Sequence, residues 1–473
     1  MISLPVGQIA QVVGGRAYAD EPAGRRTASG LVWDSREATE DCMFLAMPGE
    51  CVDGNDYIGA AIRAGAAAVI CTREPSAAVR ALAAEFLCAI VVVDDARAAL
   101  TALARWWRRQ LHAVVVGVTG STGKTSTKEF LRAVLSGRFA TVATQGNHNN
   151  EIGVPATVLS ADLDTEVLVV EMGMRGRGQI AELCEFVRPA IGVVTNIGHS
   201  HLELLGSREA IARAKAELLV SLPSSGLAVL NADDEFTPTL ELYGGGPIRG
   251  LRALTFGTAP EAHVHACNIS LDELARPSFH LEVFGRPSAD VSLAVSGLHN
   301  VSNALAAAAV GSYLGLSTAE IAAALGSVQA SGMRMELVHA AGGFTVIDDA
   351  YNASPDSMRA ALQTLAAMAC EGRRIAVLGD MGELGSDERA MHTGVGSYVA
   401  SCGIDALVCV GTRARDIYAG ALDAGFDEGQ ATWCATRDEA AALLGGMLES
   451  GDIVLVKASR FMELDSIVEG VVS

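Results

Sequence analysis

The feature that most constrains the possible fold of this chain is a short glycine-containing loop between an apolar run and a helix-forming run. The loop reads VTGSTGKTS over residues 118–126, and it follows the apolar residues 113–118. The residues from 124 onward, KTSTKEFLRAVLS, have the 3.6-residue spacing of an amphipathic helix. A strand that passes through a tight turn into a helix is the phosphate-binding arrangement of many α/β proteins.

The loop has the residue types that a polyphosphate requires. Gly120 and Gly123 allow the backbone to approach a ligand closely, and the loop N–H groups and the dipole of the following helix attract an anion. We predict that Lys124 reaches the outer phosphates and that the Thr125 hydroxyl binds Mg²⁺. The predicted nucleotide-binding residues of the loop are Thr119, Gly120, Ser121, Thr122, Gly123, Lys124 and Thr125.

One position departs from the usual phosphate-loop pattern G-x-x-x-x-G-K-[ST]. Val118 stands where that pattern has its first glycine. The alternative interpretation is an ordinary glycine-rich turn between a strand and a helix. We favour binding of ATP or GTP because the strand, the loop, the Lys-Thr pair and the helix occur in the required order.

Composition predicts a large ordered protein without membrane spans. The 473 residues suffice for about three domains, and 50% hydrophobic against 19% charged residues indicates a large core. The mean hydropathy of +0.30 comes mostly from alanine, and the apolar stretches are interrupted before the roughly 20 residues that a transmembrane helix needs. Residues 1–15 lack the basic region and continuous apolar core of a signal peptide, so we expect a cytoplasmic protein.

The net charge and the distribution of cysteines limit the kinds of partner that this protein is expected to bind. A formal net charge of −20 without a long basic run argues against nucleic-acid binding. The ten cysteines are scattered, with no C-x-x-C pair and no Cys/His cluster at zinc spacing, so reduced core thiols are expected. We therefore expect small-molecule partners, no membrane insertion and a monomeric protein.

Strand and helix patterns alternate along most of the chain. From residue 113 to 332, the candidate strands are EVLVVE (166–171), IGVVTN (191–196) and LAVLN (227–231), which predicts a parallel sheet. Alternation within 263–296 predicts a small, partly antiparallel patch, and alanine-rich helices follow from 300 to 329. A second series, FTVIDD, RRIAVLGD, DALVCVG and DIVLVKAS, predicts a C-terminal domain with its own open sheet.

Polar residues just past the strand ends are the first candidates for chemistry. In open parallel sheets the working residues lie in these loops, which points to Asp348, Asp349, Asp380 and Lys457. Glu171 ends the strand at 166–171, so its carboxylate is placed to bind Mg²⁺. A solvated loop glutamate is the alternative interpretation of Glu171.

Other polar residues stay ambiguous from spacing alone. His199 and His201 follow the strand at 191–196, and one of them is expected to bind a ligand, although position does not say which. Lys215 lies in the helical segment REAIARAKAELL, and its spacing predicts a solvated lysine. Asn300 and Asn303 are three residues apart, so both can face one way at the start of a helix; capping explains one of them more readily than both.

Taken together, these motifs resemble one family closely, the Mur ligases of peptidoglycan synthesis. They cover essentially the whole chain and comprise DSRE, MPGE and DG (34–37, 47–50, 53–54), TGSTGKTSTKE (119–129), NHNNEIGVP (147–155), VVEMGMRGRGQI (169–180), TNIGHSHLELLGS (195–207), RAKAE (213–217), GLHNVSNALAA (297–307), DDAYNASPDSM (348–358), VLGDMGELG (377–385) and VKASRFM (456–462). Each motif alone is weak, but this order and spacing are highly specific.

The resemblance implies an α/β fold of three domains and an activity. An N-terminal domain over 1–110 would bind the uridine-diphosphate part of the substrate. A central ATPase domain with a parallel sheet would cover 111–332, and a Rossmann-like domain over 333–473 would take part in dipeptide binding and closure. Within the family the motifs are closest to those of the ligase that adds D-alanyl-D-alanine to UDP-N-acetylmuramoyl-tripeptide through an acyl phosphate, using ATP and Mg²⁺.

The resemblance also implies roles that spacing could not supply. Catalytic roles are implied for Lys124, for Glu171 and His201, which would hold Mg²⁺ with Thr125, and for Lys215, which would be carbamylated by CO₂ and help to place the metal. ATP contacts are implied for Asn300, Asn303, Arg334 and Asp349. Substrate contacts are implied for Ser35 and Arg36 in the uridine-diphosphate pocket, for Asn149 and Asn150 near the sugar and peptide, and for Tyr351, Asn352 and Ser354 near the dipeptide and the reacting carboxylate.

Small departures accompany the resemblance. MPGE stands where the family more often has L-x-G, and KASR stands where KGSR is usual. The D-N-P-R motif with which the preceding ligase selects diaminopimelate is absent, and VLGDMGELG stands in the third domain instead. The third residue of the tripeptide, diaminopimelate or lysine, is left open.

Three alternative functions deserve comparison. Folylpolyglutamate synthase or an earlier Mur ligase is the nearest, but the DSR…DG region and DMGELG argue against it. A GTP-dependent switch would need a base-reading N-K-x-D, and NADD at 231–234 lacks the lysine. A binding protein with a degenerate site is disfavoured because Lys124, Thr125, Glu171 and His201 are all intact.

Overall fold

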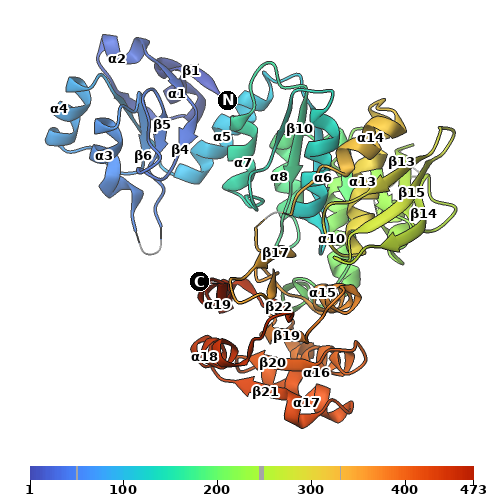
Figure 1. Ribbon diagram of the computed structural model, residues 1–473. Coiled ribbons are helices and arrows are strands. Elements are labelled where there is room, and N and C mark those ends of the chain that lie inside the picture. The colour runs from blue at the N-terminus through green and yellow to red at the C-terminus, as the bar shows by residue number, and fades with distance from the viewer. Residues whose placement is uncertain (50–51, 244–249, 331, 473) are drawn as a thin grey trace. The chain divides into compact units, whose positions relative to one another are not determined.

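Short apolar runs of the sequence form the strands of four sheets in the described residues (Figure 1). The structure, a computed structural model, describes all residues except 50–51, 244–249, 331 and 473. The described chain divides into two units, one with Met1–Gly117, Arg138–Met174 and Ile180–Ile191, the other with Val118–Gly137, Arg175–Gln179 and Gly192–Ser473. The domain boundaries at 110/111 and 332/333 stay a prediction.

The N-terminal region carries a five-stranded sheet in the order β2-β7-β6-β5-β4. Its strands are β2 (Arg16–Tyr18), β4 (Leu31–Val32), β5 (Met43–Leu45), β6 (Ala68–Cys71) and β7 (Ala89–Val92), and only the β2–β7 pair is antiparallel. The helices are α1 (Val6–Val13), α2 (Glu21–Arg25), α3 (Ile58–Arg63), α4 (Ala77–Glu85) and α5 (Ala96–Arg108). A separate antiparallel pair joins β1 (Ser3–Pro5) to β3 (Thr27–Ser29).

The central region carries a nine-stranded sheet in the order β16-β15-β14-β13-β12-β11-β8-β10-β9. Its strands are β8 (Val114–Thr119), β9 (Thr141–Ala143), β10 (Val167–Glu171), β11 (Ile191–Val194), β12 (Leu227–Asn231), β13 (Arg252–Gly257), β14 (Val264–Leu271), β15 (Pro277–Val283) and β16 (Ala289–Ser292). The last three strands pair antiparallel, so the antiparallel patch predicted within 263–296 is confirmed.

Helices that alternate with these strands carry most of the candidate residues. They are α6 (Lys124–Ser136), α7 (Gly153–Ser160), α8 (Gln179–Val187), α9 (Leu202–Leu205), α10 (Arg208–Val220), α11 (Thr237–Tyr243), α13 (His299–Tyr313) and α14 (Thr318–Leu325). Helix α13 packs against α6, and the run of alanines from Ala304 to Ala309 is buried because small side chains allow this close approach.

The C-terminal region carries a six-stranded sheet in the order β17-β18-β22-β19-β20-β21. Its strands are β17 (Glu336–His339), β18 (Thr345–Asp348), β19 (Arg374–Gly379), β20 (Ala406–Val410), β21 (Ala431–Cys434) and β22 (Ile453–Lys457), with helices α15 (Pro355–Ala367), α16 (Glu388–Val399), α17 (Ala414–Asp423), α18 (Arg437–Met447) and α19 (Asp465–Val472). Only β17 pairs antiparallel.

This C-terminal sheet is buried on both faces, which explains its continuous apolar strands. Along β19, Ala376 and Leu378 join one hydrophobic cluster, and Ile375 and Val377 join another on the opposite face. Within the part of the chain that the structure describes, no helix is long and apolar enough to cross a membrane.

Candidate active site

The glycine loop follows the buried strand β8 and leads directly into α6. Both glycines are required by their surroundings: a Cβ on Gly120 would overlap the Thr195 hydroxyl, and Gly123 has φ of 76° and lies against the Asn303 side chain. Val118, the departure from the usual pattern, is still part of β8 and is completely buried. The strand therefore continues through the position where a glycine is usual.

The end of β11 supports the loop from its other side. Thr195 Oγ1 donates a hydrogen bond to the Thr122 carbonyl (2.6 Å), and Asn196 Oδ1 accepts one from the Thr122 N–H (3.0 Å). The Ser121 N–H also donates to the Asn196 carbonyl (2.9 Å). Thr195 and Asn196 were not among the predicted site residues, although both stand in the TNIGHSH motif, and their hydrogen bonds support the loop.

Lys124 and Thr125 are the first two residues of α6. The Lys124 ammonium donates to the carbonyls of Gly120 (2.7 Å) and Ser121 (3.2 Å), so its charge lies over the loop itself. Thr125 is buried at the helix N-terminus, where backbone N–H groups point outward and favour an anion.

A buried amide network connects α6 to α13. Thr127 Oγ1 donates to Asn303 Oδ1 (3.1 Å), Asn303 Nδ2 donates to Asn300 Oδ1 (3.0 Å), and Asn300 Nδ2 donates to the Ser296 carbonyl (2.8 Å). Asn300 also lines a small pocket together with Ser126, Glu129, Phe130 and Arg334 among others. The two asparagines therefore face the same way beside the phosphate-loop helix.

Arg334 and Asp349 lie at the start of the C-terminal region. The Arg334 guanidinium stacks over the Tyr351 ring, 4.0 Å from its centroid. Asp349 follows β18, and its Oδ2 accepts from the Lys457 ammonium at the end of β22 (2.5 Å). Lys457 also donates to the Asn352 carbonyl (2.9 Å). Both members of this ion pair are buried, with side chains 13% and 3% exposed.

Replacing Lys457 with methionine is expected to destabilise the protein, because it leaves the Asp349 carboxylate buried without its cation. Loss of one partner of a buried pair costs about 3–5 kcal/mol of unfolding free energy. Urea denaturation followed by circular dichroism measures this as a lower midpoint. Arg437→Ala, which breaks a half-exposed pair with Glu463 in the same region, is the control and should cost less than about 1 kcal/mol. Equal midpoints for both variants would contradict the expectation.

Glu171 ends β10 and is buried, so the alternative of a solvated loop residue is wrong. Its N–H donates to Thr144 Oγ1 (3.0 Å), and its Oε1 accepts from Asn149 Nδ2 (2.7 Å). Its second oxygen, Oε2, is buried with no hydrogen-bond partner among the residues that the structure describes. A buried carboxylate oxygen without a partner is costly unless a cation or water satisfies it.

The two histidines of the TNIGHSH motif each meet a carboxylate from the C-terminal region. His199 Nδ1 is 2.9 Å from Asp356 Oδ2, and its N–H donates to the same oxygen (3.2 Å). His201 has φ of 65°, and its Nδ1 is 2.5 Å from Glu383 Oε2. The hydrogen bond from His201 holds the pKa of Glu383 below its ordinary value, against the opposing effect of burial.

Lys215 lies on α10 and is only 1% exposed, so the spacing-based expectation of a solvated lysine is wrong. The hydrophobic spacing of an alanine-rich helix identifies its buried face poorly, which explains the error. Burial holds the pKa of Lys215 well below its ordinary value, and the nearby positive charge of Lys124 lowers it further. A lower pKa favours the neutral amine, which is the form of a lysine that can act as a nucleophile.

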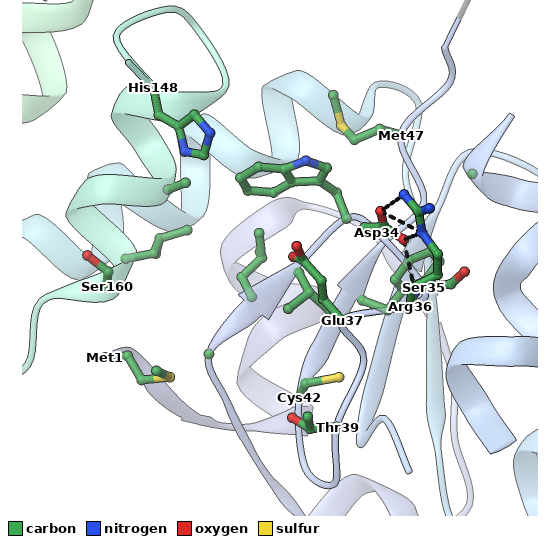
Figure 2. A pocket seen from close by; sticks show the side chains of 18 of the residues that line it. Met1, Asp34, Ser35, Arg36, Glu37, Thr39, Cys42, Met47, His148 and Ser160 are labelled. Carbon is green, nitrogen blue, oxygen red and sulfur yellow. Dashed lines mark hydrogen bonds and ion pairs between the residues drawn. The ribbon is translucent and has the colours of Figure 1, made fainter. Parts of the chain in front are cut away.

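A separate cavity of about 920 Å³ lies in the N-terminal unit (Figure 2). Ser35 and Arg36 line it, together with Asp34, Trp33 and, from the NHNN motif, His148. Arg36 donates to both Asp34 oxygens, and this hydrogen bonding lowers the pKa of Asp34 to about 2. The Trp33 and His148 rings meet edge to face, 6.2 Å apart, within the lining of the cavity.

Three remaining candidate residues have structural partners. Asn150 Oδ1 accepts from the N–H of Gly153 (2.9 Å) at the start of α7. Ser354 caps α15 with its side chain, in a capping box with Ser357. Asn352 presents its carbonyl to Lys457. Each of these residues therefore has a structural role, whether or not it also contacts a substrate.

The carboxylates that face the histidines were not among the predicted site residues. Glu383 belongs to DMGELG and Asp356 to the NASPDS segment, and both motifs were recognised without a role for these side chains. Their contacts with the histidines join residues 157 and 182 positions apart. The only signal in the sequence was the position of both acids after predicted strands of the C-terminal sheet.

Three family models match the chain. The Mur ligase family, catalytic domain, matches residues 27–108; the Mur ligase middle domain matches 118–311; and the Mur ligase, glutamate ligase domain, matches 333–460. Together these ranges cover most of the sequence and leave only short segments between them.

Full-length relatives and solved structures agree with these matches. A UDP-N-acetylmuramoyl-tripeptide–D-alanyl-D-alanine ligase of Mycobacterium bovis is 42% identical, over 100% of this chain and 98% of the relative. The crystal structure of MurF from Acinetobacter baumannii superposes with a TM-score of 0.84 at 29% identity, covering 100% and 99% of the two chains. MurF from Thermotoga maritima in complex with ADP superposes with a TM-score of 0.77 at 28% identity, covering 95% and 98%.

Proposed function

The chain belongs to the Mur ligase family, and we infer that it joins D-alanyl-D-alanine to UDP-N-acetylmuramoyl-tripeptide at the expense of ATP. The observation that carries this inference is the 42% identity, over its full length, with a relative named for that reaction. The phosphate loop and the ADP complex of the Thermotoga maritima protein support ATP as the nucleotide. The name of that relative also disfavours the folate enzyme and the GTP switch considered from the sequence.

The nucleotide is proposed to lie along the N-terminus of α6. The loop N–H groups would surround the phosphates, and Lys124 would turn from its own loop carbonyls towards the outer phosphates. We propose that the adenosine part contacts Asn300, Asn303, Arg334 and Asp349. Their positions beside α6 and at the start of the C-terminal region support this assignment.

One observation on a buried carboxylate supports a divalent cation. Glu171 Oε2 is buried without a partner among the described residues, and a carboxylate oxygen of this kind is a preferred Mg²⁺ ligand. We propose that Thr125, Glu171, His201 and, as its carbamate, Lys215 hold Mg²⁺. The bound ion would act as a Lewis acid that neutralises charge on the phosphoryl oxygens.

The reaction needs an activated carboxylate, because an oxide is a poor leaving group. An oxygen of the tripeptide carboxylate attacks the γ-phosphorus of ATP, the bond to the bridging oxygen breaks, and ADP leaves an acyl phosphate. The amine of D-alanyl-D-alanine then attacks the acyl carbon, phosphate leaves, and the nitrogen loses a proton. Lys124 stabilises negative charge on the phosphoryl oxygens throughout the first step.

The substrates are assigned to the other predicted residues. We propose that Asn149 and Asn150 approach the sugar and peptide and that Tyr351, Asn352 and Ser354 approach the dipeptide and the reacting carboxylate. The hydrogen bond from Asn149 to Glu171 supports a position close to the reacting groups for Asn149. The cavity lined by Ser35 and Arg36 has the size of a small-molecule site and suits the uridine diphosphate.

Arg36→Ala is expected to raise the KM for UDP-N-acetylmuramoyl-tripeptide about 10-fold with little change in kcat, because a charge-assisted hydrogen bond to a phosphate contributes about 1.5 kcal/mol. Steady-state kinetics with the dipeptide saturating measure both constants. Arg25→Ala is the control, since Arg25 is an exposed residue of the same unit that pairs with Glu21 outside the cavity. An unchanged KM in Arg36→Ala would remove Arg36 from the substrate site.

Phosphate release by the purified protein tests the proposed function. ATP and Mg²⁺ are supplied with the UDP-tripeptide alone, with D-alanyl-D-alanine alone, and with both. We expect release only with both, together with a pentapeptide product seen by mass spectrometry. Release that needs a single amino acid instead of the dipeptide would indicate an earlier ligase or a folate enzyme, and no release under any pairing would contradict a ligase.

A further inference from the structure

Glu383 lies in a loop that the C-terminal sheet holds in one shape. The loop follows β19 and contains residues 380–385. Asp380 Oδ1 accepts from the Arg413 N–H (3.0 Å) and the Ala414 N–H (2.7 Å), at the start of α17. The Gly382 N–H donates to Ser459 Oγ (2.9 Å). These bonds fix the backbone on both sides of Met381.

A buried histidine also holds the 380–385 loop through a hydrogen bond to its backbone. His392, on α16, is completely buried, and its Nε2 accepts from the Met381 N–H (3.0 Å). Its Nδ1 lies 2.7 Å from the Glu388 carbonyl, which can only accept a hydrogen bond. His392 is therefore neutral with its proton on Nδ1, and its hydrogen bonds anchor the residue two positions before Glu383.

The loop containing Glu383 docks on the segment 201–203 through backbone as well as side chain. The Glu203 N–H donates to the Glu383 carbonyl (3.1 Å). Gly385 has φ of 63°, and a Cβ there would come within 3.0 Å of the Glu203 Cα, so a larger residue would be strained at this close contact. Glu383 itself has φ of 61°, a conformation that an L-residue adopts only when its surroundings impose it.

This contact between the two segments places the Glu383 carboxylate against one ring nitrogen of His201. The Oε2 to Nδ1 distance is 2.5 Å, and an ionised carboxylate can only accept, so Nδ1 carries the proton. The lone pair of a neutral imidazole in this tautomer is on Nε2. In metal sites, a carboxylate that holds the second ring nitrogen of a histidine ligand fixes both its tautomer and its ring orientation.

We propose that Glu383 is a positioning residue: it holds His201 with Nε2 free for the catalytic cation, so that docking of the 380–385 loop completes the metal site. The proposal rests on the proposed function, because it takes His201 as a ligand of Mg²⁺. A loose Glu383 would leave the His201 ring free to rotate and to place its proton on Nε2.

The first measurement is the tautomer of His201 in protein without metal or nucleotide. Two-bond ¹H–¹⁵N spectra of protein labelled with ¹⁵N-histidine distinguish a proton on Nδ1 from one on Nε2, and the signal is assigned by its loss in His201→Asn. We expect the Nδ1–H form in the wild type and a mixture with Nε2–H in Glu383→Ala. Glu383→Gln, whose amide oxygen still accepts, should retain most of the wild-type form.

The second measurement is the binding of Mn²⁺ in the presence of ADP, with free Mn²⁺ counted by electron paramagnetic resonance. Loss of the partner that orients a ligand lowers metal affinity roughly 10–100-fold, so we expect Glu383→Ala to bind Mn²⁺ about 10-fold more weakly. Glu383→Gln should lie between Glu383→Ala and the wild type. If Glu383→Ala does not fold, Glu383→Leu, which keeps the side-chain volume, is read in both measurements.

Asp356→Ala is the matched control, because Asp356 makes the same kind of contact to His199, which lies two residues before His201. It should leave the His201 tautomer and the Mn²⁺ affinity unchanged. A wild-type tautomer and wild-type Mn²⁺ affinity in Glu383→Ala would overturn the proposal, and so would an equal effect of Asp356→Ala. Neither measurement involves turnover, so an absence of ligase activity in the wild type would contradict the proposed function separately.

Discussion

Lys124→Ala is expected to lower kcat about 1,000-fold or more, because it would remove the cation that we propose faces the transferring phosphoryl group. Lys124 is the first residue of α6, and its ammonium already lies 2.7 Å from the Gly120 carbonyl, within the loop that would surround the phosphates. The variant loses the two hydrogen bonds from Lys124 to the loop carbonyls, but the contacts by which Thr195 and Asn196 support the loop do not involve this side chain. The variant should therefore fold normally and fail in chemistry.

The measurement is phosphate release with both substrates saturating, accompanied by circular dichroism to verify the fold. Arg138→Ala is the control, because Arg138 is an exposed positive residue just beyond the end of α6. It should turn over at the wild-type rate, which separates loss of the phosphate contact from a general change in charge. Wild-type turnover by a folded Lys124→Ala protein would show that the loop does not serve phosphoryl transfer.

The rule that parallel sheets place their working residues past the strand ends singled out two residues that the structure brings together. Asp349 and Lys457 were singled out on that rule, and the structure brings them to 2.5 Å because β18 and β22 are neighbours. Buried parallel strands read as continuous apolar runs, which made β10, β12, β19 and β22 recognisable. The edge strands β17 and β21 were missed because they are short and partly exposed, so their pattern is weak.

Contacts between distant loops could not be predicted from one sequence. Apolar spacing reports which face of an element is buried, but it does not say which loop from another part of the chain lies against it. The partners of His199 and His201 lie 157 and 182 residues away, so nothing local identified Asp356 or Glu383. The buried position of Lys215 was missed for a related reason, since the alanines around it give α10 no clear polar face.

The resemblance to Mur ligases contributed what neither spacing nor geometry supplied. It implied a modified Lys215, whereas spacing indicated a solvated lysine. The structure shows that Lys215 is buried, and the carbamate itself is implied only by the resemblance. Substitution of Lys215 therefore tests this implied role directly.

Lys215→Ala is expected to lower kcat about 10- to 100-fold, and small carboxylates such as formate or acetate should partly restore it. The Lys215 amine is buried. Its pKa lies well below the ordinary value, mainly because of burial and also because of the positive charge of Lys124. A neutral amine nitrogen can bond to the carbon of CO₂ and release a proton, which places a carboxylate at the end of the side chain. An added carboxylate can occupy the space that alanine leaves.

The modification can be observed directly because the chain has only four lysines, Lys124, Lys128, Lys215 and Lys457. Protein equilibrated with ¹³C-bicarbonate should give a carbamate carbon signal that disappears in Lys215→Ala and persists in Lys457→Met. Rescue by carboxylates together with this signal would establish that the residue acts as a carboxylate. Absence of both would mean that Lys215 serves as a buried amine, and the metal would then depend on Thr125, Glu171 and His201 without it.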